Sequence, residues 1–349
     1  MSLILRKLKQ EVGIVGIIRL ITSFLYLGVH NLYLRTYSRG KGVLKEDLKK
    51  LKARHKIEGR EVFNFFPHSD NKVHKGSLDW AVNAAPRNAF YNTLKDVLSL
   101  IGSTSAATEE QVKLAKELLP NDKEDSYYRS HALNKGKNDQ WEYYLVPWHR
   151  LVPSFSFLLW DERFTDHLLP IFKKYKKWYN EFIWFTAVGT GSNIYASEAG
   201  KAFHCLNEFV IEGDEKALDR YVNHVLKVKY FMKSAFDGGI PMEGGIYARF
   251  LLDGIILLDQ VHRALGFDFK LIDDGLVEKF ADYLDTAFTR GKGFETSGDS
   301  HWELEKLEDY RVFIYMSMIS KYPIFLEILT HYPPKPYHFT YFFKTDYDS

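Results

Sequence analysis

Apolar residues recur every three to four positions along most of the second half of the chain, the spacing of helices that bury one face. This pattern predicts helices at about 161–180, 194–211, 215–235, 245–265, 275–289 and 303–330. Strict alternation of apolar and polar positions is absent there, so no series of strands is expected. Repeated antiparallel helix pairs without a heptad seam predict an all-α fold, namely an α/α toroid or incomplete α/α barrel.

The first 40 residues have basic ends and an apolar middle, and they form a segment of their own. The apolar middle reaches the roughly 20 residues that span a bilayer, but Arg19 interrupts it and no small-residue cleavage site follows. Two interpretations remain: a basic amphipathic helix lying on a membrane, or an N-terminal helix packed on the domain. We therefore divide the chain into residues 1–40 and a toroid-like helical domain at 41–349.

Further helices are predicted in the first part of that domain. Residues 41–60 are highly charged, with Leu44, Leu48 and Leu51 at helical spacing, so the charges mark a solvated face. Helices at about 89–101 and 108–118 follow, the second after a capping run at 105–110.

The stretch from Phe236 to Phe269 joins a glycine-rich loop to a long apolar helix. Glycines around Pro241 prevent regular structure in its first part. The loop carries one acid, Glu243, and delivers Tyr247 to the start of the helix, which Gly266 ends. A helix hairpin in which Tyr247 and Glu243 only cap and pack accounts equally well for this composition.

This stretch resembles the toroid domain of polysaccharide lyases of the heparinase II/III and alginate-lyase type. The resemblance is carried by Asp-Gly-Gly at 237–239, Glu243 ahead of Gly-x-Tyr at 245–247, the apolar helix and its Ala-Leu-Gly-Phe-Asp ending at 264–268. It covers about Trp184 to His301. In that family a Tyr at this junction is the catalytic acid/base, which implies that role for Tyr247.

The resemblance also implies a substrate-binding Asn upstream of the Tyr. Here Asn193 stands 54 positions before Tyr247, but Ile194 occupies the place of the His that follows the Asn in the family. The family's β-sandwich should follow a Gly-Asp element, which Asp299 matches. We expect instead one more helix near 310–329 and a tail rich in Pro and Tyr.

Trp148, His149 and Arg150 stand between Pro147 and Pro153, which predicts a turn limited by the two prolines. The trio could stack on a sugar ring and pair with its carboxylate. A buried aromatic corner between helices is the equal alternative.

The composition of the chain excludes several classes of function. A net charge of +2 gives the whole protein no strong positive potential that would attract nucleic acid. The single cysteine, Cys205, excludes an internal disulfide and a metal site built from several cysteines. A cytoplasmic or peripheral membrane location is therefore favoured over secretion. The sequence contains no P-loop, Rossmann glycine pattern, nucleophile elbow or zinc motif, so we expect no cofactor and no metal.

These observations predict a protein that acts on an acidic, uronate-containing polysaccharide by β-elimination or C5 epimerisation. Both reactions remove the proton beside the sugar carboxylate and need that carboxylate neutralised. Tyr247 would be the acid/base and Asn193 would bind the carboxylate, with positive charge from Arg249 and from His149 or Arg150.

Two alternatives stay open. An α/α-barrel glycoside hydrolase would use paired carboxylates, for which Glu243 and Asp299 are the loop candidates and Glu198 a third. A toroid without catalytic activity would bind a glycan or a partner protein. The oligomeric state is not predicted.

Overall fold

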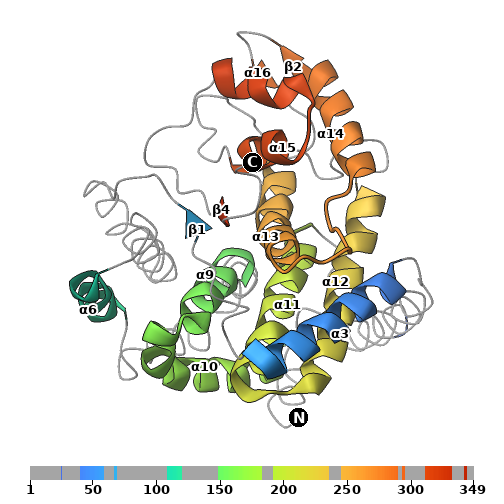
Figure 1. Ribbon diagram of the computed structural model, residues 1–349. Helices are drawn as coiled ribbons and strands as arrows, with labels where there is room; N and C mark the ends of the chain where they lie inside the picture. The colour runs from blue at the N-terminus through green and yellow to red at the C-terminus, as the bar shows by residue number, and fades with distance from the viewer. Residues whose placement is uncertain are drawn as a thin grey trace, which may run out of the picture.

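The computed structural model describes residues 25, 40–58, 67–68, 108–119, 148–182, 192–235, 245–289, 293–294, 311–331 and 342–343. Its helices are α3 (Lys41–Glu58), α6 (Glu109–Leu118), α9 (Trp148–Trp160), α10 (Glu162–Phe182), α11 (Ser192–Glu212), α12 (Glu215–Ala235), α13 (Gly245–Ala264), α14 (Asp274–Ala287), α15 (Arg311–Ile319) and α16 (Pro323–His331) (Figure 1). Two-residue strands pair antiparallel as β1 (Pro67–His68) with β4 (Phe342–Phe343), and β2 (Phe288–Thr289) with β3 (Gly293–Phe294). The described part is therefore all-helical in class, which confirms the prediction of an all-α protein.

Helix positions follow the hydrophobic periodicity closely. The helices predicted at 215–235 and 245–265 appear as α12 and α13, and the leucines predicted to be buried on α3 are at most 4% exposed. The predicted cap of α6 is also present, because Thr108 and Gln111 exchange the two hydrogen bonds of a capping box. Gly266 ends α13 with a positive φ of 68°, as a helix stop requires.

Two predictions are wrong, and proline is involved in both. Trp148, His149 and Arg150 form the first turn of α9 and not a turn limited by prolines, since the helix continues through Pro153. Pro153 is only the sixth residue of α9, where a proline removes a single helical hydrogen bond. The helix predicted through 310–329 is divided into α15 and α16, because the residue before Pro323 is disfavoured in helical conformation.

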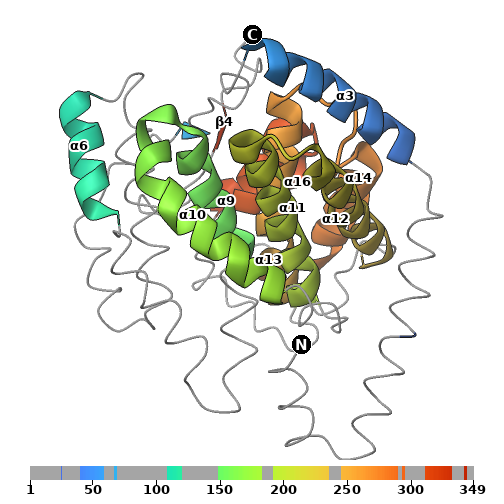
Figure 2. The same ribbon diagram turned by 90° about the horizontal axis from the view of Figure 1, so that it is seen from below.

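α11 forms the centre of the core. It packs against α9, α12 and α13, and Figure 2 shows it lying among these helices. Every residue from Glu198 to Val210 is buried, so this helix has no solvated face along its middle. Trp160 of α9 stacks on Phe203 of α11, with ring centroids 6.0 Å apart.

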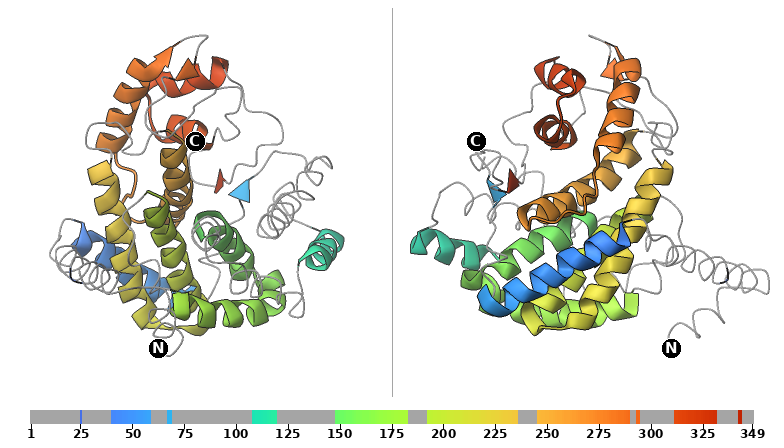
Figure 3. Two further views of the ribbon diagram at one scale, coloured as in Figure 1. Left: turned by 180° about the vertical axis from the view of Figure 1, so that it is seen from behind. Right: turned by 45° about the vertical axis from the view of Figure 1, so that its right-hand side comes forward.

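α3 lies across α12, on the outside of this core (Figure 3). Asp47, a buried acid of α3, accepts hydrogen bonds from the backbone N–H groups of Asp268 and Phe269 in the loop after α13, at 3.1 and 2.9 Å. α3 is therefore attached to a segment more than 200 positions later in the chain.

The predicted N-terminal segment, the helix at 89–101 and the tail beyond 331 lie outside the described residues, apart from Leu25, Gly40 and β4. Among the helices that the structure describes, none is both long enough and apolar enough to cross a membrane.

Candidate functional site

α11 and α13 lie side by side and run in the same direction. Two residues, Gly213 and Asp214, reverse the chain between α11 and α12. The chain reverses again between α12 and α13, because Tyr221 near the start of α12 hydrogen-bonds to His262 near the end of α13. α11 and α13 also contact each other directly, so their first turns lie at the same end of the pair.

This arrangement places three predicted site residues. Asn193 is the second residue of α11, and Tyr247 and Arg249 are the third and fifth residues of α13. From the contact of Tyr221 with His262, fifteen residues lead back to Tyr247, which is about 22 Å of helix. Asn193 likewise lies fifteen residues, or about 22 Å of helix, before Glu208 of α11, which pairs with Arg220 of α12.

The structure does not place the remaining predicted site residues beside the first turns of α11 and α13. Trp148, His149 and Arg150 form the start of α9, which packs against both α11 and α13. Glu243 and Asp299 lie outside the described residues.

A set of buried ionisable side chains follows α11, and the sequence analysis did not predict it. Glu198, Lys201, His204 and Glu208 are each 5% exposed or less. Their spacing of three, three and four residues puts them along one face of the helix. That spacing is the signal that could identify the set, and of the four residues the sequence analysis names only Glu198, as a third candidate for a hydrolase carboxylate.

Glu198 is the centre of the first group. Its carboxylate contacts Lys201, Nδ1 of His224 at 2.7 Å and Nζ of Lys227 at 3.8 Å. Burial alone would raise the pKa of Glu198, but the charges of Lys201 and Lys227 and the hydrogen bond from His224 hold that pKa well below its usual range. Burial also lowers the pKa of Lys201. Glu198 is thus an ion-paired core acid, a poor choice for the hydrolase carboxylate.

Glu208 organises the second group, one turn from the end of α11. It pairs with Arg220 of α12 and lies 3.3 Å from Nζ of Lys176 on α10. Cys205 is buried on the same helix, and burial raises the pKa of its thiol, which keeps it protonated and unreactive. These ion pairs join α10, α11 and α12.

Burial lowers the pKa of His204 to about 3, and it also lowers the pKa values of His224 and His262. In the unfolded chain a histidine has a pKa of about 6.5, so on acidification the unfolded state binds protons first. The stability that neutral His204 contributes is therefore complete above pH 6.5 and is lost as the pH falls towards 3, and the contributions of His224 and His262 likewise decrease below pH 6.5.

We predict that His204→Gln lowers the slope of unfolding free energy against pH by up to about 1.4 kcal/mol per pH unit below pH 6.5. Urea denaturation at pH 7.5, 6 and 5 measures this slope. Any packing loss in the variant shifts all three values alike. An unchanged slope would show that His204 is not held neutral in the fold.

The loop between α13 and α14 is held by a second buried acid. Asp259 of α13 accepts hydrogen bonds from the backbone N–H groups of Leu271 and Ile272, from Arg263 and from the hydroxyl of Tyr315. The distances are 2.6–3.0 Å, and Asp259 is completely buried. One carboxylate thus fixes the loop to α13 and to α15.

His262 holds the same loop from the other side. Its Nδ1 lies 3.0 Å from the carbonyl oxygen of Phe269 and must donate there, so in the neutral ring Nε2 accepts from the Tyr221 hydroxyl. The backbone groups of the loop are thus bonded to α3, to α13 and, through Lys229 and the carbonyl oxygen of Leu271, to α12.

No protein-family model, curated protein or solved structure matches this chain. In the part that the structure describes, no three His, Cys, Asp or Glu side chains are grouped as metal ligands would be. The function is therefore inferred from the placement of the chain's own residues.

Proposed function

We propose that the protein is an α/α toroid that acts on a uronate-containing polysaccharide by β-elimination or C5 epimerisation. The observation that supports this most directly is the parallel packing of α11 and α13, with Asn193 and Tyr247 in first turns at the same end. The antiparallel α11–α12 and α12–α13 pairs are of the kind from which a toroid is built.

In this proposal Tyr247 removes the C5 proton of the uronate, and Asn193 hydrogen-bonds the neighbouring carboxylate. The electron pair left at C5 forms a double bond to C4, the C4–O bond breaks, and a proton passes to the leaving oxygen. In epimerisation the proton instead returns to the opposite face of C5. Arg249 follows Tyr247 by two positions on α13, which places it on the opposite face of the helix, so the positive charge that favours the ionised tyrosine has to come from another group.

The test is to incubate the full chain with a panel of uronate polysaccharides and follow the ultraviolet absorbance of the unsaturated product. Tyr247→Phe should lower the rate by about 10²–10⁴-fold, the usual contribution of a general acid or base. Tyr283→Phe on α14 is the matched control and should keep the wild-type rate. Solvent deuterium incorporated at C5 without an absorbance change would identify epimerisation.

One outcome would replace the proposal. Release of reducing ends without an unsaturated product, lost in Glu243→Gln and kept in Tyr247→Phe, would identify a glycoside hydrolase with paired carboxylates.

A further inference from the structure

A row of apolar side chains follows the outer side of α16. Tyr322, Leu326 and Leu329 are spaced four and three residues apart, which puts them on one side of the helix and of the residue just before it. Leu326 is 60% exposed, while Tyr322 and Leu329 are half-buried. The side of α16 that joins the core is formed by other residues, namely Ile324, Phe325 and Ile328. We call the three residues of the outer side the apolar row.

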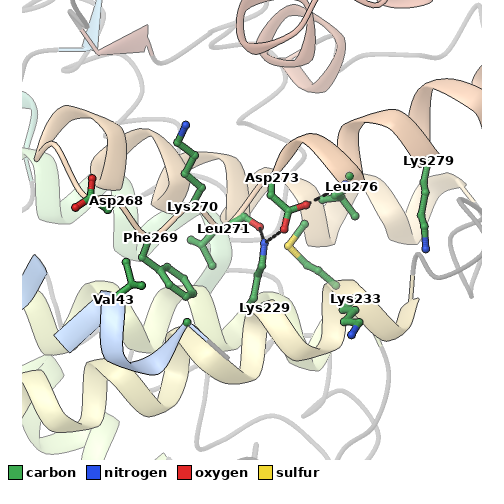
Figure 4. Close-up of a pocket in the computed structure, with 13 residues that line it drawn as sticks. Val43, Lys229, Lys233, Asp268, Phe269, Lys270, Leu271, Asp273, Leu276 and Lys279 are labelled. Carbon is green, nitrogen blue, oxygen red and sulfur yellow. Dashed lines mark hydrogen bonds and ion pairs between the residues drawn. The ribbon is translucent and has the colours of Figure 1, made fainter. Parts of the chain in front are cut away.

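A row of four exposed acids runs along the neighbouring helix α14. They are Asp274, Glu278, Asp282 and Asp285. Their spacing of four, four and three residues puts them on one side of the helix, and we call them the acid row. Within the part of the chain that the structure describes, no lysine or arginine forms an ion pair with any of these carboxylates. By contrast Asp273, just before the helix, pairs with Lys229 at 2.6 Å (Figure 4).

The acid row is unfavourable for α14 by itself. Like charges four residues apart on a helix repel each other. Asp285 lies in the last turn, where the helix dipole favours basic residues, and that turn contains no basic residue. Lys279, the basic residue of α14, points to the side of the helix that faces α12 (Figure 4). Residues that oppose the local rules of helix stability are expected at functional sites.

The acid row and the apolar row border the same surface. Phe280 of α14 contacts Phe325 of α16, with ring centroids 6.0 Å apart. Further along both helices Phe288 contacts His331 at 6.1 Å, so α14 and α16 pack side by side and run in the same direction (Figure 1). Tyr322 connects the two rows, because desolvation raises the pKa of its hydroxyl and the nearby negative charges of three of the four acids raise it further.

We propose that this surface binds a basic amphipathic helix of a partner protein. The apolar side chains of the partner helix cover the apolar row, and its lysines or arginines face the acid row. α14 and α16, with the two residues before α16, contain five acids and two lysines, so the surface attracts a basic segment and repels nucleic acid and anionic membranes. A helix of about three turns is long enough to cover both rows. This inference does not depend on the proposed glycan chemistry.

The experiment measures the binding of a fluorescently labelled peptide to the full chain by fluorescence anisotropy. The peptide contains only leucine and lysine, is about 14 residues long so that it can form a helix, and has its leucines on one side. A second peptide has the same composition in scrambled order. The full chain should bind the amphipathic peptide about tenfold more tightly than the scrambled one, because only the first can bury the apolar row. Binding should weaken as the salt concentration rises.

Two variants test the two rows separately. Glu278→Lys combined with Asp282→Lys should weaken binding of the amphipathic peptide about tenfold, and Leu326→Ser should weaken it about fivefold. All three side chains are exposed, so both variants should unfold at the wild-type temperature. The control, Glu117→Lys combined with Asp219→Lys, makes the same charge change at exposed positions of α6 and α12 and should keep the binding.

Several results would overturn the proposal. An equal loss of binding in the control would show that net charge suffices, and equal affinity for the scrambled peptide would show that the apolar row is not used. No binding of either peptide would also contradict it. Self-association of the full chain, measured by light scattering and lost in Glu278→Lys with Asp282→Lys, would assign the surface to a second copy instead. Glycan turnover should be unchanged in these variants, which separates this test from that of Tyr247.

Discussion

Replacing Asp259 by alanine is expected to lower the free energy of unfolding by about 3–5 kcal/mol. The substitution removes the acceptor of two buried backbone N–H groups, those of Leu271 and Ile272, and of the Tyr315 hydroxyl. Each buried donor left without a partner costs about 1–3 kcal/mol. Arg263, which is mostly buried, loses its ion pair as well. Urea denaturation followed by circular dichroism measures the change.

Two further variants test whether the loss of stability comes from the buried carboxylate of Asp259. Asp259→Asn keeps one oxygen for the backbone donors and should cost less than alanine. Asp268→Ala lies in the same loop, but its side chain is 72% exposed and its pair with Lys50 is worth about 0–1 kcal/mol. If Asp259→Ala costs no more than Asp268→Ala, the buried carboxylate does not hold the loop.

Local pattern was sufficient to predict most helices of the described part. The leucines of α3 have helical spacing, and Gly266 allows the positive φ at the end of α13, so each signal lies within a few residues of its effect. Asp259 is an example of what a local pattern cannot predict. It bonds to a loop twelve positions on and to Tyr315, 56 positions away, and no local spacing identifies such partners.

The candidate site was predictable only in part, for a related reason. Hydropathy places charged residues on the solvated face of a helix, yet Glu198, Lys201 and Glu208 are buried on α11. Their partners come from α10 and α12, so burial is possible only once the tertiary fold supplies opposite charges. Asn193 and Tyr247 could be nominated from a resemblance, but their shared end depends on two reversals of the chain.

The ion pair of Glu198 with Lys201 gives the second large effect. Glu198→Leu should destabilise the fold by about 3–5 kcal/mol, because it leaves the ammonium group of Lys201 buried without its carboxylate. Lys201→Met should cost less, because Glu198 keeps His224 at 2.7 Å and Lys227 at 3.8 Å as partners. The double variant removes both charges and replaces them with apolar side chains of similar size, so it should cost less than Glu198→Leu alone.

This cycle also separates a structural role from a catalytic one. A buried lysine with a lowered pKa is a common catalytic group, and Lys201 meets that description. Lys201 is only 3% exposed, however, and its partner Glu198 is itself bonded to His224, so we expect the pair to serve the fold. The double variant should then recover stability and keep glycan turnover. Recovered stability with turnover lost by 10²-fold or more would instead assign the chemistry to Lys201, the size of effect expected for a proton-transfer group.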